Sequence, residues 1–285
     1  MRAEAAPRPP EPADEELRSS REAESEATRG AIPVAGGTDV LVHWPERLEL
    51  RDRTYIDLGR LRELRYARLE DGWLELGALA TYWDLQQDAR IAVEFPLLVD
   101  AARVVGAIQI QARGTWAGNV ANASPAADGV PALMALGAIV VLASAEGRRE
   151  VPLDRFYSGY KVMDLRTDDL IAAIRVPRRR LRFHRFLKVG PRRAQAIAKV
   201  GAAVVHADEG WRIAAASVAP TVRRCRAVEE YLGGGGRPTA PEDLLPSLRQ
   251  DVSPIDDLRS NAAYRETVLA RVLYDALRDG GAAAG

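Results

Sequence analysis

Two segments rich in glycine and small polar residues are the parts of this chain best suited to chemistry. The first is Ala35–Asp39, with the sequence AGGTD, and the second is Gly114–Asp128, with the sequence GTWAGNVANASPAAD. Glycine allows positive φ and carries no Cβ, so successive backbone N–H groups can turn towards one anion. Two such loops facing each other would hold a pyrophosphate without a basic side chain. The pair therefore predicts a phosphate-binding site.

Other kinds of chemistry have few residues to support them. The single cysteine, Cys225, excludes an internal disulfide and any thiolate-held iron–sulfur cluster or structural zinc site within this chain. The three histidines, His43, His184 and His206, are too few and too scattered to favour a histidine-rich metal centre. No neighbouring motif supplies Cys225 with an activating base, so we expect a buried, inert thiol.

Composition limits the possible partners. Lys plus Arg and Asp plus Glu are both 40 in 285 residues, so a neutral chain gives no electrostatic reason to expect nucleic acid or an anionic membrane. Arginines at 175, 178, 179, 180, 182 and 185 therefore indicate a solvated edge or a partner-docking face. No apolar run has the length of a membrane span, and the acidic, proline-rich start differs from a secretory signal. We predict a cytoplasmic protein.

The elements around the two loops are expected to be short strands and helices. Residues 1–12 are a predicted disordered lead-in, residues 14–28 a surface helix, and residues 31–35 a strand entering the first loop. Further strands are predicted over 48–58 and 74–78, with a turn at 70–72. A helix capped by Thr81 should run to residue 88, and another should cover 96–105.

Beyond the second loop the pattern changes from helices to strands. A helix is predicted over 131–136, a strand over 138–143, a turn over 147–150, a loop or short helix over 154–160 and a strand over 170–176. Pro177 marks the predicted boundary between a domain of residues 13–177 and one of 178–285. The second domain should begin with an antiparallel meander of three strands, 182–189, 198–207 and 211–219, turning at 208–210. A helix over 226–232 stops at four glycines, and an amphipathic helix covers 262–278 through Tyr264, Val268, Val272, Leu273 and Leu277.

Five ordered motifs resemble the FAD-binding medium subunit of the molybdenum hydroxylases, the xanthine dehydrogenase and carbon monoxide dehydrogenase type. They are AGGTD at 35–39, the segment from Thr115 through Ser124–Pro125 to Asp128, LELGALAT at 74–81, DLIAAI at 169–174 with Pro177, and FLKVG at 186–190 with IAKV at 197–200. The resemblance runs from about residue 32 to residue 278. It implies an α+β fold: a two-part FAD-binding domain of the vanillyl-alcohol-oxidase/PCMH type, then a smaller α+β domain with a three-stranded antiparallel sheet and helices.

The resemblance also implies the residues that would bind FAD. They are Pro33, Val34, Ala35, Gly36, Gly37, Thr38, Asp39 and Val40 in the first loop, Thr115, Trp116, Ala117, Gly118, Asn119, Ser124 and Asp128 in the second, and Ile171 and Lys188. Asp128 would accept from a ribose or ribityl hydroxyl, or would simply cap the next helix. Ile171 would lean on the isoalloxazine ring, or belong to the core. Lys188 would lie beside the ring, or be a solvated strand-end lysine.

Two aromatic residues have no single expected place. Trp116 and Tyr160 could pack at the flavin or at a subunit boundary. No residue is expected to act as an acid–base catalyst or to bind a metal. Replacing Gly37 or Gly118 with a bulky residue should abolish FAD retention and leave the fold largely intact.

In this family, subunits of this kind transfer electrons. The resemblance implies that electrons from two [2Fe–2S] clusters in a small partner subunit pass through FAD to NAD⁺ or another acceptor. Molybdopterin would lie in a large partner subunit, and the assembly would be a dimer of heterotrimers. A freestanding flavin oxidase or reductase is one alternative. A non-catalytic assembly subunit without FAD is another, favoured by Ala117 in place of a glycine, Val105 in place of an aromatic, and QIQA at 109–112 in place of QIRN.

Overall fold

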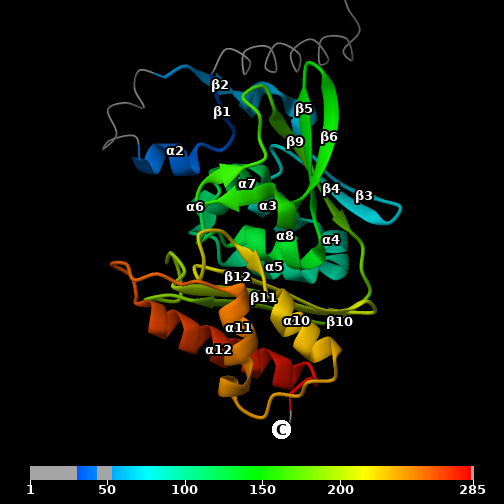
Figure 1. Ribbon diagram of the computed structural model, residues 1–285. Coiled ribbons are helices and arrows are strands. Elements are labelled where there is room, and N and C mark those ends of the chain that lie inside the picture. The colour runs from blue at the N-terminus through cyan, green and yellow to red at the C-terminus, as the bar shows by residue number, and fades with distance from the viewer. Residues whose placement is uncertain (1–30, 44–52, 284–285) are drawn as a thin grey trace, which may run out of the picture.

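A five-stranded antiparallel sheet forms the centre of the N-terminal portion of the chain (Figure 1). The structure, a computed structural model, describes residues 31–43 and 53–283, so the predictions for 1–12 and 14–28 lie outside the described residues. The strand order is β3 (Ala67–Glu70), β4 (Trp73–Gly77), β9 (Leu170–Pro177), β5 (Ile139–Ser144) and β6 (Gly147–Pro152). Leu76 and Val140 both pair with Ile174 of the central strand, and all three are fully buried.

Short helices cover this sheet and fill the space below it. They are α3 (Tyr82–Gln87), α4 (Ala89–Glu94), α5 (Pro96–Arg103), α6 (Ile108–Gln111), α7 (Trp116–Asn122) and α8 (Gly129–Leu136). Thr81 caps α3 through a capping box, in which Asp84 N donates to Thr81 Oγ1 and Thr81 N donates to the Asp84 carboxylate. Every residue of α8 is buried, because helices and strands surround it on all sides.

A separate parallel pair of strands carries the first glycine loop. Strand β1 (Ile32–Val34) pairs with β2 (Tyr55–Asp57), and the loop leads from β1 into α2 (Thr38–His43). Residues 48–52 of the strand predicted over 48–58 lie outside the described residues. The strand is confirmed at β2, but Leu58 already begins the 3-10 helix η2 (Leu58–Arg60), which η3 (Arg62–Leu64) follows.

The C-terminal portion is a second antiparallel sheet covered by helices. Its three long strands were predicted and are β10 (Leu181–Val189), β11 (Val200–Ala207) and β12 (Gly210–Ala216). The predicted bounds were wrong at residues 198–199 and 217–219, which are not strand. The prediction of a three-stranded sheet missed a short fourth strand, β13 (Arg223–Arg224), which pairs with β12. Helices α10 (Arg226–Gly233) and α12 (Ala262–Asp279) were predicted, whereas η4 (Pro241–Leu244) and α11 (Leu245–Asp251) were not.

The C-terminal sheet has helices on both faces, and its strand β11 is almost entirely buried (Figure 1). Ala203 and Val205 of β11 belong to the core that α5 and α8 share with the N-terminal sheet. Ala202 and Val204 face a second core formed with α10, α11 and α12. Because successive side chains of a strand alternate between faces, an apolar residue at nearly every position of β11 allows it to serve both cores. One face of the C-terminal sheet therefore belongs to the same core as the N-terminal sheet.

Two segments between the sheets differ from the predictions. The turn predicted over 147–150 is wrong: the chain turns at Ala145–Glu146, and residues 147–152 form β6, paired along its length with β5. The segment predicted as loop or short helix over 154–160 contains α9 (Leu153–Phe156) and then β7 (Tyr157–Gly159), which forms a small hairpin with β8 (Val162–Met163).

Five of the six arginines near the predicted domain boundary pair with carboxylates of this chain. The pairs are Arg175 with Glu75 and Glu150, Arg178 with Glu94, Arg179 with Glu209, Arg182 with Asp208 and Arg185 with Asp279. Cys225 is fully buried in the second core, and burial raises the pKa of its thiol well above the ordinary value. Among the described residues, no helix has both the length and the apolar character to cross a membrane.

Candidate functional site

The two glycine loops lie in direct contact. A Cβ added to Gly36 would lie 1.8 Å from the carbonyl oxygen of Arg113, which immediately precedes the second loop. Arg113 Nε donates to the Gly36 carbonyl oxygen at 3.3 Å. Gly37 has φ of 71°, in the left-handed region that favours glycine. The sequence-based prediction that the loops face each other is therefore confirmed in its geometry.

Backbone hydrogen bonds fix the second loop against the start of α3. Tyr82 N donates to the Gly114 carbonyl at 3.2 Å, and Trp116 N donates to the Ala80 carbonyl at 3.1 Å. Thr115 caps α7 by accepting from Gly118 N at 3.0 Å. Ala117 lies inside α7 without positive φ, so alanine replaces the family's glycine there without backbone strain.

A cleft of about 1260 Å³ opens beside the two loops. Fifteen of the predicted site residues line it: Pro33, Val34, Ala35, Gly36, Gly37, Thr38, Asp39 and Val40, then Thr115, Ala117, Gly118, Asn119, Ser124 and Asp128, and Ile171. Val105 lines it too, as does Tyr160, which is 63% exposed. Two predicted site residues, Trp116 and Lys188, do not line it.

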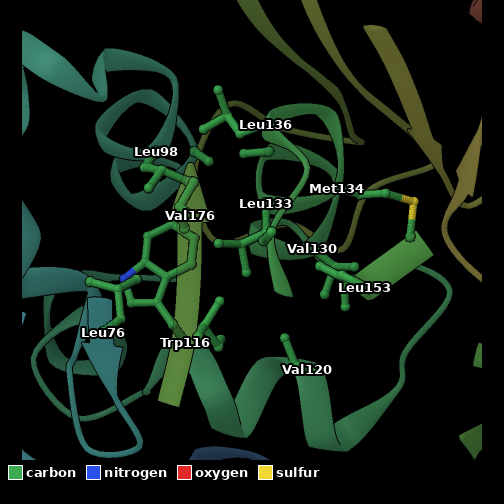
Figure 2. Close-up of a cluster of buried hydrophobic side chains, with 14 of the residues drawn as sticks. Leu76, Leu98, Trp116, Val120, Val130, Leu133, Met134, Leu136, Leu153 and Val176 are labelled. Atoms are coloured by element: carbon green, nitrogen blue, oxygen red, sulfur yellow. The ribbon is translucent and has the colours of Figure 1, made fainter. Parts of the chain in front are cut away.

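Trp116 is a core residue. Its side chain is fully buried among Leu76, Leu98 and Leu133 (Figure 2). Neither the flavin-facing nor the subunit-boundary position expected for this side chain is correct. As the first residue of α7 it sits directly after the capping threonine, and the opposite side of that helical turn faces the cleft.

Lys188 acts on the cleft through Asp128. Its Nζ donates to Asp128 Oδ2 at 2.6 Å and to the Val104 carbonyl at 2.8 Å, and only 10% of its side chain is exposed. It is therefore not the solvated strand-end lysine of the alternative interpretation. Burial raises the pKa of Asp128 to about 6, although the charge and hydrogen bond of Lys188 oppose the rise.

The alternative interpretation of Asp128, as a helix cap, is not observed. Asp128 occupies the position before α8, but its side chain makes no capping hydrogen bond. Gly129 N donates instead to Asn119 Oδ1 at 3.2 Å, which links the start of α8 to α7. Ser124 Oγ accepts from Ala126 N at 3.2 Å, and this bond shapes the turn between the two helices.

The far wall of the cleft comes from the C-terminal portion and was not predicted. Its lining residues are Gln195, Ala196, Ile197, Ser217, Ala219, Pro220, Ile255, Asp257, Arg259 and Arg265. Tyr82 was also missed. It lines the cleft between the loops, and its hydroxyl is buried with no hydrogen-bond partner among the described residues. Apart from Ile197 in the IAKV motif, no local motif marks these positions, because only tertiary packing brings them to the cleft.

The cleft fits an extended, phosphate-containing cofactor better than a metal or a small ion. Glycines 36, 37, 114 and 118 leave backbone exposed along one side, and the volume is that of a drug-sized or larger ligand. Asp128 and Asn119 offer hydroxyl-binding groups deeper in, and Val105 and Ile171 offer apolar surface.

Comparison with known protein families agrees with this site. A sequence profile described as the FAD binding domain in molybdopterin dehydrogenase matches residues 16–179, which is more than half of the chain. The chain belongs to this family. A second profile, the CO dehydrogenase flavoprotein C-terminal domain, matches residues 185–279. This FAD-binding subunit of the molybdenum hydroxylase family thus has the two-part α+β architecture that the sequence motifs implied.

Individual relatives agree with the family assignment. The chain is 34% identical over 172 residues to the nicotinate dehydrogenase FAD-subunit of Eubacterium barkeri, covering 59% of this chain and 58% of that protein. It is 30% identical to the carbon monoxide dehydrogenase medium chain of Hydrogenophaga pseudoflava, covering 86% and 87%. A solved carbon monoxide dehydrogenase structure from the same organism superposes with a TM-score of 0.80 at 28% identity, covering 92% and 94% of the two chains.

Proposed function

We propose that this FAD-binding subunit holds FAD in the cleft beside the two glycine loops. The observation that carries the proposal is the contact between the loops, where Gly36 leaves no room for a Cβ against Arg113. The backbone N–H groups around Gly36 and Gly37 would bind the pyrophosphate, together with the hydroxyl of Thr38. Gly118, whose own N–H donates to Thr115, would let the cofactor approach α7 closely because it has no Cβ. FAD, when bound, supplies the redox chemistry.

The remaining residues would orient the cofactor. Asp128 would accept a hydrogen bond from a ribose or ribityl hydroxyl, and Lys188 would keep its carboxylate in place. Ile171, buried on β9 and facing the cleft, would support the isoalloxazine ring. Trp116 would contribute through the core beneath the loop and not by contact.

We further propose that the subunit transfers electrons from the [2Fe–2S] clusters of a small partner to NAD⁺ or another acceptor. A molybdopterin-binding large subunit would complete the assembly as a dimer of heterotrimers. The names of the relatives, an FAD-subunit and a medium chain, support a multi-subunit enzyme. A division after Pro177 into domains of 13–177 and 178–285 accords with the two family matches. The cytoplasmic location stays a prediction.

Gly36→Ala tests the cofactor site. The added methyl group would collide with the Arg113 carbonyl and push the loops apart, so we expect FAD affinity to fall at least tenfold. Visible absorption of the desalted chain, followed by FAD titration of the apoprotein, measures this.

Gly233→Ala is the matched control for that substitution. Gly233 is exposed at the end of α10 with nothing within 4 Å of an added Cβ, so this variant should bind FAD as the wild type does. Equal FAD affinity in the wild type and Gly36→Ala would reject the two-loop site. The same titration would favour an assembly subunit without FAD if the wild type bound none, alone or with its partners.

A further inference from the structure

Ser217 has an unusual backbone conformation at the wall of the cleft. Its φ is 65°, in the left-handed region, although it is not a glycine. This conformation costs a residue with a Cβ about 1 kcal/mol or more, so surrounding contacts must hold it. All three of its polar atoms are engaged: Ser217 N donates to the Pro125 carbonyl at 2.7 Å, and Oγ donates to the Ala198 carbonyl at 2.9 Å. The Ser217 carbonyl accepts from Arg265 at 2.8 Å.

Arg265 is the group that holds Ser217 in place. It lies on α12 and is only 2% exposed. Its Nη1 donates to the carbonyls of both Ser217 and Lys199, at 2.8 and 2.9 Å, and its Nη2 donates to Asp257 Oδ1 at 2.6 Å. A buried guanidinium with a carboxylate partner and two carbonyl acceptors is a rigid fork, which a lysine could not reproduce.

The bond from Ser217 N reaches the part of the second glycine loop that lacks regular structure. Pro125 lies in the turn between α7 and α8, two helices that end and begin at Asn122 and Gly129. Ser124, Ala126, Ala127 and Asp128 in this turn all line the cleft. The turn begins at Ala123, which also has positive φ, so the local sequence alone favours no single conformation.

We infer that Ser217 and Arg265 are positioning residues of the cofactor site: Arg265 fixes Ser217, and Ser217 fixes the Ser124–Asp128 turn of the second loop. The inference rests on the proposed FAD site. It means that α12, far along the chain from both glycine loops, sets the position of Ser124 and Asp128 in the cleft.

Two substitutions at Ser217 separate its backbone conformation from its side chain. Ser217→Gly adopts φ of 65° freely and keeps both backbone bonds, so FAD affinity should stay within about threefold of the wild type. Ser217→Val is β-branched and strongly disfavours that conformation, so the bond to Pro125 should break and FAD affinity should fall at least tenfold. Arg265→Lys, which keeps the charge but not the fork, should lower affinity similarly and serves if Ser217→Val does not fold.

Amide hydrogen exchange of the full-length apoprotein provides a readout independent of FAD. In Ser217→Val and Arg265→Lys we expect faster exchange of the backbone amide at position 217 and of those across residues 126–128, and unchanged exchange in β5 and β9. Arg249→Lys is the control: Arg249 pairs with Glu266 on the exposed side of α12, so both FAD affinity and exchange in the turn should match the wild type.

Retained FAD affinity and wild-type exchange in the turn of Ser217→Val or Arg265→Lys would overturn the inference. So would equal loss of affinity in Ser217→Gly and Ser217→Val, because the hydroxyl would then be the important group. A wild-type chain that binds no FAD, or a Gly36→Ala variant that binds it normally, would instead overturn the proposed cofactor site. The exchange measurement would still decide whether Ser217 and Arg265 order the turn.

Discussion

The Asp128–Lys188 pair is a buried charged contact at the edge of the cleft. Its two side chains are 14% and 10% exposed and come from α8's start and from β10. Removing one partner leaves the other charge buried, so Asp128→Asn and Lys188→Met should each lower the free energy of unfolding by about 3 kcal/mol. The double variant should recover much of the loss. Urea unfolding of all four proteins measures the coupling, and strictly additive losses would contradict it.

The raised pKa of Asp128 makes a second, pH-dependent prediction. With a folded pKa of about 6 and an unfolded value near 3.9, the native state binds more protons than the unfolded state between these pH values. Stability therefore falls as pH rises from about 4 to about 6, and is level above. Relative to Asp128→Asn, the wild type should lose roughly 2–3 kcal/mol over that interval. A constant difference between pH 4 and pH 7 would show an ordinary pKa.

At the residue scale, the site residues predicted from the sequence are those whose type suggests a role in any fold. Gly36, Thr115 and Asp128 were predicted because glycine, a helix-capping threonine and an isolated carboxylate each suggest a structural or binding role wherever they occur. Arg265 was not, because on an amphipathic helix an arginine ordinarily faces water. Tyr264 was assigned to the buried stripe of that helix, yet Tyr264 is 41% exposed and Arg265 is buried. The carbonyls of Ser217 and Lys199 and the carboxylate of Asp257 explain why Arg265 is buried.

At the scale of elements, both ends of α8 are bound by the C-terminal portion. Lys188 approaches its start through Asp128, and two arginines bind the carbonyls of its last turn. Arg179 Nε donates to Leu136 O at 2.8 Å, and Arg212 Nε donates to Ala135 O at 2.6 Å. Cations at a helix C-terminus are favourable because they oppose the partial negative charge of the unpaired carbonyls. The helix is therefore held by the sheet it packs against.

Gly137 tests the contact at the end of α8. Its φ is 81°, and an added Cβ would lie 2.9 and 3.0 Å from the guanidinium nitrogens of Arg212 and Arg179. We expect Gly137→Ala to lower the free energy of unfolding by about 3 kcal/mol. Gly72→Ala has a matching φ of 84° with nothing within 4 Å, so it should cost only the backbone term, about 1–2 kcal/mol. Equal losses in thermal or urea unfolding would mean that the arginines move aside freely.

Helices and strands were predicted well where their own sequence determines them, and poorly where pairing with a neighbouring element determines them. The strands β9 and β11 carry long apolar runs, and α3 carries its capping box, so their sequences suffice. Residues 147–150, with the sequence GRRE, have little intrinsic strand preference and become β6 only because β5 pairs with them. The two-residue strand β13 likewise exists only through β12.

At the scale of the whole molecule, the shared core joins the two portions into one unit. Cys225, the only cysteine, is fully buried in the C-terminal core and should react with a thiol reagent only when that core opens. If the portions unfold together, FAD at 100 times its Kd should stabilise the native state by about 2.7 kcal/mol and slow the reaction about 100-fold. A rate independent of FAD would show that the C-terminal portion opens alone.

The cleft also dictates when during synthesis the cofactor can bind. Its lining residues run from Ile32 to Arg265, so the chain must be translated and folded as far as Arg265 before the cleft is complete. Domains usually fold as they leave the ribosome, beginning with the N-terminal one. A nascent chain halted at Gly190 would already contain both glycine loops and still lack the opposite wall. We therefore expect FAD to bind late, after translation has passed α12.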